Sequence, residues 1–431
     1  MSYMRTIPLS TVFHIIILAD QLSISVMKAR YQYRIYPTDQ QRGLLAQLFG
    51  CVRVVYNDAL ALCRYDKVVK TSALQKVFIT LAKKTKARSW LSDVSAIPLQ
   101  QSIADLGVAY QNFFKHNRGY PKFKKRSNQQ SARFNRNGFS IHRGKVYLAK
   151  VGLLSTKWSR KLPSEPSSVT VIKDCANRYF LSFVVEVEPA SKPALRESIG
   201  ADLGISIFAA LSTSEKIYSP NYKTLFAKIA RTQKQLSRCL KGSNRREKVR
   251  LKLARLHAKL ADTRKDFLHK LSTRLVRENK IVVLEDLNVS GMVKNRKLAR
   301  AISRCGWSSF RTMCEVKSNQ YQDREVRVID RWTPTSQYCS NCGYKWGKLD
   351  LSVREIVCIN CNTAHCRDAN ASKNINNVGL GHSHDSERVP SATKRRQGRS
   401  SKWTVSDGKT PVASCCETST RKLEIVQLEL F

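Results

Sequence analysis

The chain has 431 residues, of which 42% are hydrophobic, so it can bury several cores, and its length favours two to four domains. Lys and Arg number 76 against 32 Asp and Glu, which gives a formal net charge of +44. This excess is beyond what solubility needs, and binding a polyanion releases its condensed counterions, so a nucleic acid is the expected partner. Charge alone leaves open a ribosomal-type scaffold or a protein that binds membrane surfaces.

The cysteines and the N-terminus indicate a reducing compartment. The thirteen cysteines are odd in number, and those outside residues 336–375 lack regular spacing, which favours a cytoplasmic protein over a secreted one. The apolar run at 12–20 contains His14 and is too short to span a bilayer. Because Met27 opens the strand-like "MKARYQYRIYPT", we expect it to be the true start and residues 1–26 to be an upstream extension.

The first half of the chain predicts a β-domain with a helical insertion. Residues 28–36 alternate as a strand does, and further alternating or β-branched runs follow between 133 and 188. The first strand would be an unpaired edge by itself, so we expect it to join the later ones in a barrel or sandwich. This domain comprises residues 27–38 and 130–197, and residues 39–129 form the helical insertion.

Two basic segments are candidates for nucleic-acid binding. The loop at 115–126 carries six Lys or Arg, no acid, and two aromatic residues, which fits a nucleic-acid clamp and a solvated loop equally well. The helices predicted over 223–278, with a break near Gly242, repeat basic residues every three or four positions, and this favours contact with phosphates. The candidate contacts are Lys122, Lys124, Lys125, Arg126, Lys228, Arg231, Lys234, Arg238, Lys252 and Arg255.

The second half predicts a further mixed domain, so we expect an α+β multidomain protein. It begins with "IGADLGI" and a hairpin, and continues after the basic helices with a buried-type strand at 280–288. A helix around 303–321 and the strand "EVRVID" follow. Residues 380–431 are polar and basic without periodicity, so we expect a disordered basic tail.

Four cysteines have the spacing of a zinc ribbon. Cys339 and Cys342 form one Cys-x-x-Cys pair, and Cys358 and Cys361 form a second after fifteen residues. Two such pairs place four thiolates tetrahedrally around Zn²⁺, whereas a redox dithiol needs only one pair. The neighbouring His365 and Cys366 lie outside this spacing, and we expect them to be unligated. A structural zinc ion has no open position, so it organises the chain without performing chemistry.

Three acidic residues are candidates for catalysis. Metal-assisted hydrolysis of a phosphodiester uses carboxylates that hold Mg²⁺ ions about 4 Å apart. Asp202 lies in a strand with small neighbours, Glu285 ends a second strand, and Asp368 opens a short helix. Each alone is more often a cap, a turn or an ion-pair residue, but this order is typical of an RNase H-like site. Asp286 competes with Glu285, and strand alternation sends the two to opposite faces without choosing between them.

These motifs resemble the TnpB proteins, the OrfB family of insertion sequences, from about Met27 to Gly379. "YPKFKKR" is similar to a segment of the family's helical and barrel region, and "GADLGI", "VVLEDLNVSGM", "CSNCG", "CINC" and "RDANASKNI" resemble its RuvC motifs and zinc ribbon. The resemblance implies a wedge-like barrel with a helical recognition insertion, RuvC at 198–335 plus 366–379, and a zinc ribbon at 336–365. It implies that Asp202, Glu285 and Asp368 are the catalytic acids and Mg²⁺ ligands.

The family contains RNA-guided DNA endonucleases related to type V CRISPR effectors. The resemblance therefore implies a guide RNA from the transposon end, target DNA with a short flanking motif, and a separately encoded transposase of the same element as further partner. We expect action at the nucleoid, with Mg²⁺ for cleavage and structural Zn²⁺. The alternatives are a nuclease-dead RNA-guided binder that regulates DNA, or a transposase that itself performs strand transfer. One departure concerns Cys366, where family members often carry Asp.

Overall fold

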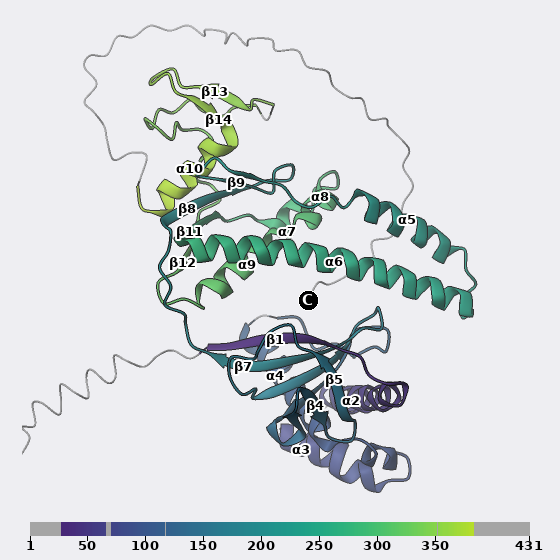
Figure 1. Cartoon of the computed structure of the whole chain (residues 1–431). Helices are drawn as coiled ribbons and strands as arrows, with labels where there is room; N and C mark the ends of the chain where they lie inside the picture. The colour runs from purple at the N-terminus through teal and green to yellow at the C-terminus, as the bar shows by residue number, and fades with distance from the viewer. Residues whose placement is uncertain (1–26, 66–69, 117, 351, 383–431) are drawn as a thin grey trace, which may run out of the picture. The chain divides into compact units, whose positions relative to one another are not determined.

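The computed structural model describes residues 27–65, 70–116, 118–350 and 352–382 (Figure 1). The expected extension at 1–26 and nearly all of the expected tail therefore lie outside the described residues. The described chain contains a seven-stranded sheet with helices, a five-stranded mixed sheet with helices, and a small two-stranded sheet.

The N-terminal strand belongs to the seven-stranded, barrel-like sheet, as predicted. β1 (Met27–Ile35) pairs antiparallel along its whole length with β7 (Tyr179–Val187) and at its end with β5 (Gly152–Lys157). The strand order is β2-β6-β7-β1-β5-β4-β3. The remaining strands are β2 (Gln130–Asn135), β3 (Phe139–His142), β4 (Lys145–Leu148) and β6 (Ser168–Lys173). The unpaired edge that β1 would form alone is thus removed.

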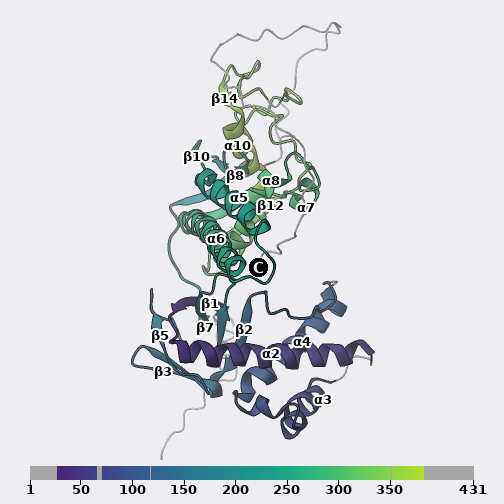
Figure 2. The same ribbon diagram turned by 90° about the vertical axis from the view of Figure 1, so that its right-hand side faces the viewer.

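Helices follow β1 in the chain, again as predicted. α2 (Asp39–Tyr65) packs against α4 (Ala96–His116), and both contact β2 (Figure 2). Between them lie α3 (Thr71–Gln75), a π-helical turn (Lys76–Leu81) and 3₁₀ turns at Ala82–Lys84 and Ser89–Ser92. α2 is long and apolar enough to cross a membrane, but half of its most apolar window is buried inside the protein, which is typical of a core helix.

The five-stranded sheet has the order β10-β9-β8-β11-β12. Its strands are β8 (Arg196–Leu203), β9 (Ala209–Leu211), β10 (Lys216–Ile217), β11 (Asn279–Glu285) and β12 (Glu325–Ile329). β8, β11 and β12 are parallel, whereas β9 runs antiparallel to β8. Because parallel strands end at one edge, the residues that finish β8, β11 and β12 lie together there, which is where ligands bind in such sheets.

The helices of this part confirm the predicted hairpin and correct one boundary. α5 (Lys223–Ser237) and α6 (Asn244–Glu278) are separated at Gly242, and the side chain of Ser243 caps α6. The helix expected around 303–321 is confirmed as α9 (Trp307–Ser318), but it begins later than predicted, because α8 (Ala299–Cys305) ends at Gly306 with φ +75°. That left-handed conformation suits glycine and ends a helix. A short helix, α7 (Val289–Met292), follows β11.

The last helix, α10 (Arg367–Gly379), lies across β8 and β11 (Figure 1). Two glycines permit this close packing. A Cβ added at Gly200 of β8 would lie 2.3 Å from the carbonyl oxygen of Ser372, and one at Gly379 would lie 2.3 Å from the side chain of Val283. The small residues around Asp202 thus have the role predicted for them, since they let a helix approach the strand.

We expect Gly200→Ala to destabilise this part of the protein by about 1–3 kcal/mol, because the added methyl group meets backbone atoms of α10 that must shift. Urea unfolding followed by circular dichroism measures the loss. Gly43→Ala in α2 is the matched control, because no atom lies within 4 Å of the added methyl group. That change should stabilise α2 by about 0.5–1 kcal/mol. Equal effects of the two substitutions would contradict the packing argument.

Candidate active site and metal centre

The structure brings the three predicted acids toward one edge of the five-stranded sheet. Leu284 of β11 is in register with Ala201 of β8, so the next residues along these strands, Glu285 and Asp202, lie at the same level. Asp368 is the second residue of α10, which packs on β8. Asp202 and Asp368 line one cavity of about 480 Å³.

The charges of these acids act on one another. Burial, reinforced by the negative charges of Glu285 and Asp368, raises the pKa of Asp202 to about 7, although the nearby Arg367 opposes this. Burial also raises the pKa of Glu285. Carboxylates whose charges and burial raise a pKa in this way favour binding of a divalent cation, since the cation relieves both the repulsion and the desolvation.

The choice between Glu285 and Asp286 can be made from their surroundings. Asp286 accepts a hydrogen bond from Arg311 Nη1 at 2.9 Å and is also bound by Arg331, and these bonds lower the pKa of its carboxyl group. Glu285 is half-buried, and its charge acts on Asp202. Asp286 therefore belongs to an arginine network, and strand alternation directs Glu285, whose charge acts on Asp202, to the opposite face.

Three residues that sequence reasoning missed as site residues line the cavity with Asp202 and Asp368. Arg354 Nη1 lies 3.3 Å from Asp368 Oδ1, and Lys216 and Cys366 complete this side. A hydrogen bond to Cys366 raises the pKa of Lys216. Lys216 begins β10, and Arg354 lies in the segment that carries the cysteines. No sequence motif or residue spacing marks either of them as a site residue. In the sequence, Cys366 is notable only as an unligated neighbour of the zinc-ribbon cysteines and as a departure from the resembled family.

The raised pKa of Asp202 predicts a specific pH dependence of stability. Because the folded state holds this proton more tightly than the unfolded state, the site costs stability as pH rises from about 4 to about 7, and the full cost persists above that. In Mg²⁺-free buffer we expect Asp202→Asn to be more stable than wild type at about pH 8, by up to about 4 kcal/mol, and to gain nothing below about pH 4. Urea unfolding across pH measures this, and parallel curves would contradict it.

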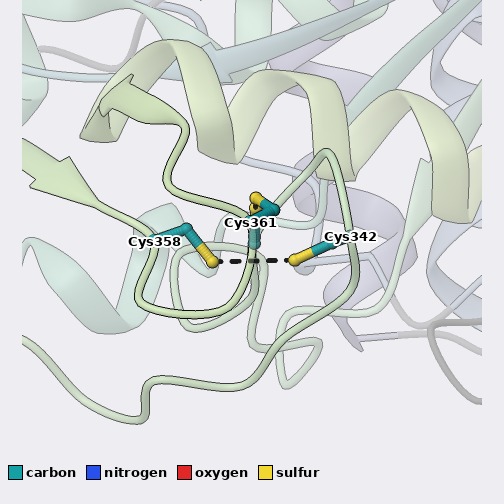
Figure 3. A group of neighbouring side chains, drawn as sticks. Cys342, Cys358 and Cys361 are labelled. Carbon is teal, nitrogen blue, oxygen red and sulfur yellow. Dashed lines mark hydrogen bonds between the residues drawn. The ribbon is translucent and has the colours of Figure 1, made fainter.

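The four predicted cysteines form a compact cluster, of which Figure 3 shows Cys342, Cys358 and Cys361. Their sulfur atoms all lie within 4.8 Å of one another, with Cys339 Sγ 3.7 Å from Cys361 Sγ and Cys342 Sγ 3.6 Å from Cys358 Sγ. A tetrahedral ion with Zn–S bonds of about 2.3 Å separates its sulfur ligands by about 3.8 Å, so the cluster could bind zinc without rearrangement. His365 Nε2 lies 3.1 Å from Cys339 Sγ, and that contact suits a hydrogen bond to a thiolate.

Hydrogen bonds connect the cysteine cluster to α10. The side-chain oxygen of Asn370 accepts from Ser340 N at 2.8 Å, and its amide donates to Tyr338 O at 2.7 Å. Asn374, fully buried, donates to Thr335 O and Tyr338 O. The small sheet of β13 (Glu355–Val357) and β14 (Ala364–Cys366) runs directly into α10. The segment that holds the cysteines therefore fixes the helix that carries Asp368.

Most of the predicted nucleic-acid contacts are exposed. On α5 and α6 these are Lys228, Arg231, Lys234, Lys252 and Arg255, with Arg238 directly after α5. In the basic loop Lys122, Lys125 and Arg126 are exposed, but Lys124 is half-buried and its ammonium lies 4.1 Å from the centre of the Tyr56 ring. Asn57 pairs with both the N–H and the carbonyl of Lys124, which fixes the loop against α2.

Family models match three stretches of the chain. Residues 182–296 match a model described as "Probable transposase", from the OrfB proteins of IS605-type elements. Residues 307–375 match the TNB domain of Cas12f1-like proteins, and residues 27–67 match a model described as a helix-turn-helix domain. The described residues of that last stretch form β1 and the single long helix α2, so its name does not describe this structure.

Relatives and a solved structure match most of the chain. Two proteins named "Putative RNA-guided DNA endonuclease" are similar to it: one of Streptomyces pristinaespiralis is 44% identical over 87% of this chain and 95% of its own, and InsQ of Escherichia coli K12 is 29% identical over 82% and 92%. A Cas12f1–sgRNA–target DNA complex contains a chain of the same fold, with TM-score 0.53 and 13% identity, over 81% of this chain and 98% of that one. The extent of the match to the Streptomyces protein, together with the transposase model, shows that the chain belongs to the TnpB (OrfB) family.

Proposed function

We propose that this protein is a transposon-encoded, RNA-guided, Mg²⁺-dependent DNA endonuclease that cuts DNA beside a short flanking motif. The observation that carries the proposal is the electrostatic coupling of Asp202 to Glu285 and Asp368 at one edge of the sheet. Relatives named as RNA-guided DNA endonucleases match almost the whole chain, which supports the same activity. A protein that only binds DNA gains nothing from three acids gathered beside a polyanion.

Asp202, Glu285 and Asp368 would hold Mg²⁺, a hard cation that prefers carboxylate oxygens. Among the residues that the structure describes, only the four cysteines form a group whose ligand atoms all lie within 4.8 Å. The three acids are therefore less closely grouped than the cysteines, and we assign to them a pair of Mg²⁺ ions. Such ions supply an activated water molecule and stabilise the charge of the leaving oxygen. Arg354 neutralises Asp368 when no cation is bound.

The other parts of the chain would handle the nucleic acids. We assign residues 198–335 and 366–379 to a RuvC-type nuclease domain and 336–365 to a zinc ribbon that positions Asp368. The barrel-like sheet and its helical insertion would read the flanking duplex motif. A protein that holds an RNA–DNA heteroduplex grips its backbone, and the exposed basic residues of α5 and α6 suit that task.

The test is guided cleavage by the purified complex. The chain is co-expressed with its flanking genomic DNA, the RNA that purifies with it is sequenced, and a plasmid library with randomised flanks beside the programmed target is added with Mg²⁺. Depletion of plasmids that share one flanking motif, absent when Mg²⁺ is omitted, is the expected result. Bound RNA without depletion would favour a guided binder instead. The absence of a discrete RNA, together with joining of transposon ends, would favour a transposase.

A further inference from the structure

One aromatic side chain beside the candidate active site is almost fully exposed. Trp332 is 84% exposed, more than any other large hydrophobic side chain in the described part of the chain. No aromatic or cation–π contact involves its ring among the described residues. By contrast, the side chain of Trp307 in α9 is buried in the core and only 3% exposed. An indole that is left in water at a defined position suggests a partner that covers it.

Trp332 follows the strand that pairs with Glu285. Ile329, the last residue of β12, is in register with Glu285, and its carbonyl accepts a hydrogen bond from Asp286 N at 3.1 Å. Trp332 is three residues further on, and three residues span at most about 11 Å. Its backbone therefore lies no more than about 11 Å from Ile329, just beyond the edge at which β11 ends with Glu285.

Hydrogen bonds hold this tryptophan in place. Thr333 N donates to Asp330 O at 3.1 Å, which closes a turn, and Trp332 N donates to Asp330 Oδ1 at 2.7 Å. Arg331, the residue between, binds Asp286, which also accepts from Arg311 of α9. These bonds attach the turn to the strand that carries Glu285. They fix the backbone from which the exposed indole projects.

We propose that Trp332 is a stacking platform for an unpaired base of the DNA strand that the three acids cut. The proposal rests on the proposed function and deepens it, since it gives the form in which the substrate reaches the site. The exposed indole has no stacking partner in the described structure, and a base offers a flat apolar face that could stack on it. Stacking on an aromatic side chain tolerates any sequence, as a guided enzyme requires. The positive charge of the chain suits the phosphates on either side of that base.

The first experiment compares wild type, Trp332→Ala and Trp332→Phe as full-length complexes with the RNA that purifies with them. The substrates are a programmed target and the same target with abasic positions on either side of the cut. We expect Trp332→Ala to lower kcat/KM on the intact target about tenfold and to change little on the abasic target, where no base is available to stack. Trp332→Phe keeps a stacking face and should recover most of the activity. Equal losses on both substrates would overturn the proposal.

The second experiment needs no cleavage and so separates this inference from the proposed function. Indole fluorescence is titrated with a short oligothymidylate and with an abasic oligonucleotide of the same length, in wild type and in Trp332→Phe. Stacking of a base on Trp332 is supported if the oligothymidylate quenches the wild-type fluorescence, while the abasic strand does not and the Trp332→Phe variant shows no quenching. This result would support the platform even if the wild type cuts nothing. If the wild type cuts its target but its fluorescence does not change, the stacking role of Trp332 would be refuted, while the proposed nuclease activity would stand.

Discussion

Replacing Asp202 by alanine is expected to abolish guided cleavage while the protein keeps its bound RNA and its fold. Asp202 ends β8 at the level of Glu285 and lines the same cavity as Asp368, so its loss removes one of the three proposed Mg²⁺ ligands. Metal ions supply several kcal/mol of charge stabilisation during phosphodiester hydrolysis, and the loss of this contribution lowers the rate by about a thousandfold or more. Cleavage of a programmed plasmid and recovery of RNA from the purified complex measure the two properties. An equal loss of both would argue against a catalytic role.

A pair of neighbouring acids provides the control for this prediction. Glu285→Gln should lose cleavage as completely as Asp202→Ala does, because Glu285 is a proposed Mg²⁺ ligand whose charge acts on Asp202. Asp286→Asn removes one negative charge at the next position, where the carboxylate is held by ion pairs with Arg311 and Arg331, so it should retain most of the activity. If Asp286→Asn were the inactive member of this pair, the assignment of the second acid would be wrong.

Replacing Cys339 by serine is expected to remove zinc and, with it, the correct position of α10. The sulfur of Cys339 is buried, lies 3.7 Å from that of Cys361, and accepts a hydrogen bond from Asn341 N. A structural zinc site contributes folding free energy directly, so the ribbon should unfold locally and Asp368 should lose its support through Asn370 and Asn374. Zinc content by mass spectrometry and guided cleavage both should fall, the latter about a hundredfold, as when metal-site supports are lost.

The matched control for the zinc site is Cys175→Ser. Cys175 is exposed, lies in the turn before β7, and has no other cysteine beside it in the described structure. Zinc content, stability and cleavage should all stay at the wild-type level. If Cys339→Ser retained its zinc, the four-cysteine assignment would be refuted. If it lost zinc but cleaved normally, the ribbon would have no part in positioning Asp368.

Local patterns predicted much of this fold. The alternation in β1 and the unpaired edge it implied were enough to predict its return to β7, and two Cys-x-x-Cys pairs predicted a cluster with the right sulfur separations. The strand acids and the helix acid were predicted from the order of their elements. Each of these signals lies within a few neighbouring residues, or follows from a general rule about sheet edges or metal geometry.

The remaining features depend on contacts between distant segments. The break of the helix at Gly306 depends on one backbone conformation, which a glycine permits but does not require. The ion pair of Arg354 with Asp368 joins the ribbon to α10, and the fixing of Lys124 by Asn57 joins a loop to α2. Strand alternation alone does not distinguish Asp286 from Glu285, whereas the contacts of Asp286 with Arg311 and Arg331 do. No periodicity or spacing encodes such pairs.

The position of Asp368 also affects how the protein is made. α10 is synthesised after the whole of the sheet on which it packs. Because Gly200 has no side chain, α10 can pack closely against β8 there. A nascent chain in which α10 has not yet been made therefore has Asp202 and Glu285 but not Asp368, and the surface of β8 is uncovered until translation has passed the ribbon. On the proposed function, cutting would begin only after α10 has emerged and docked.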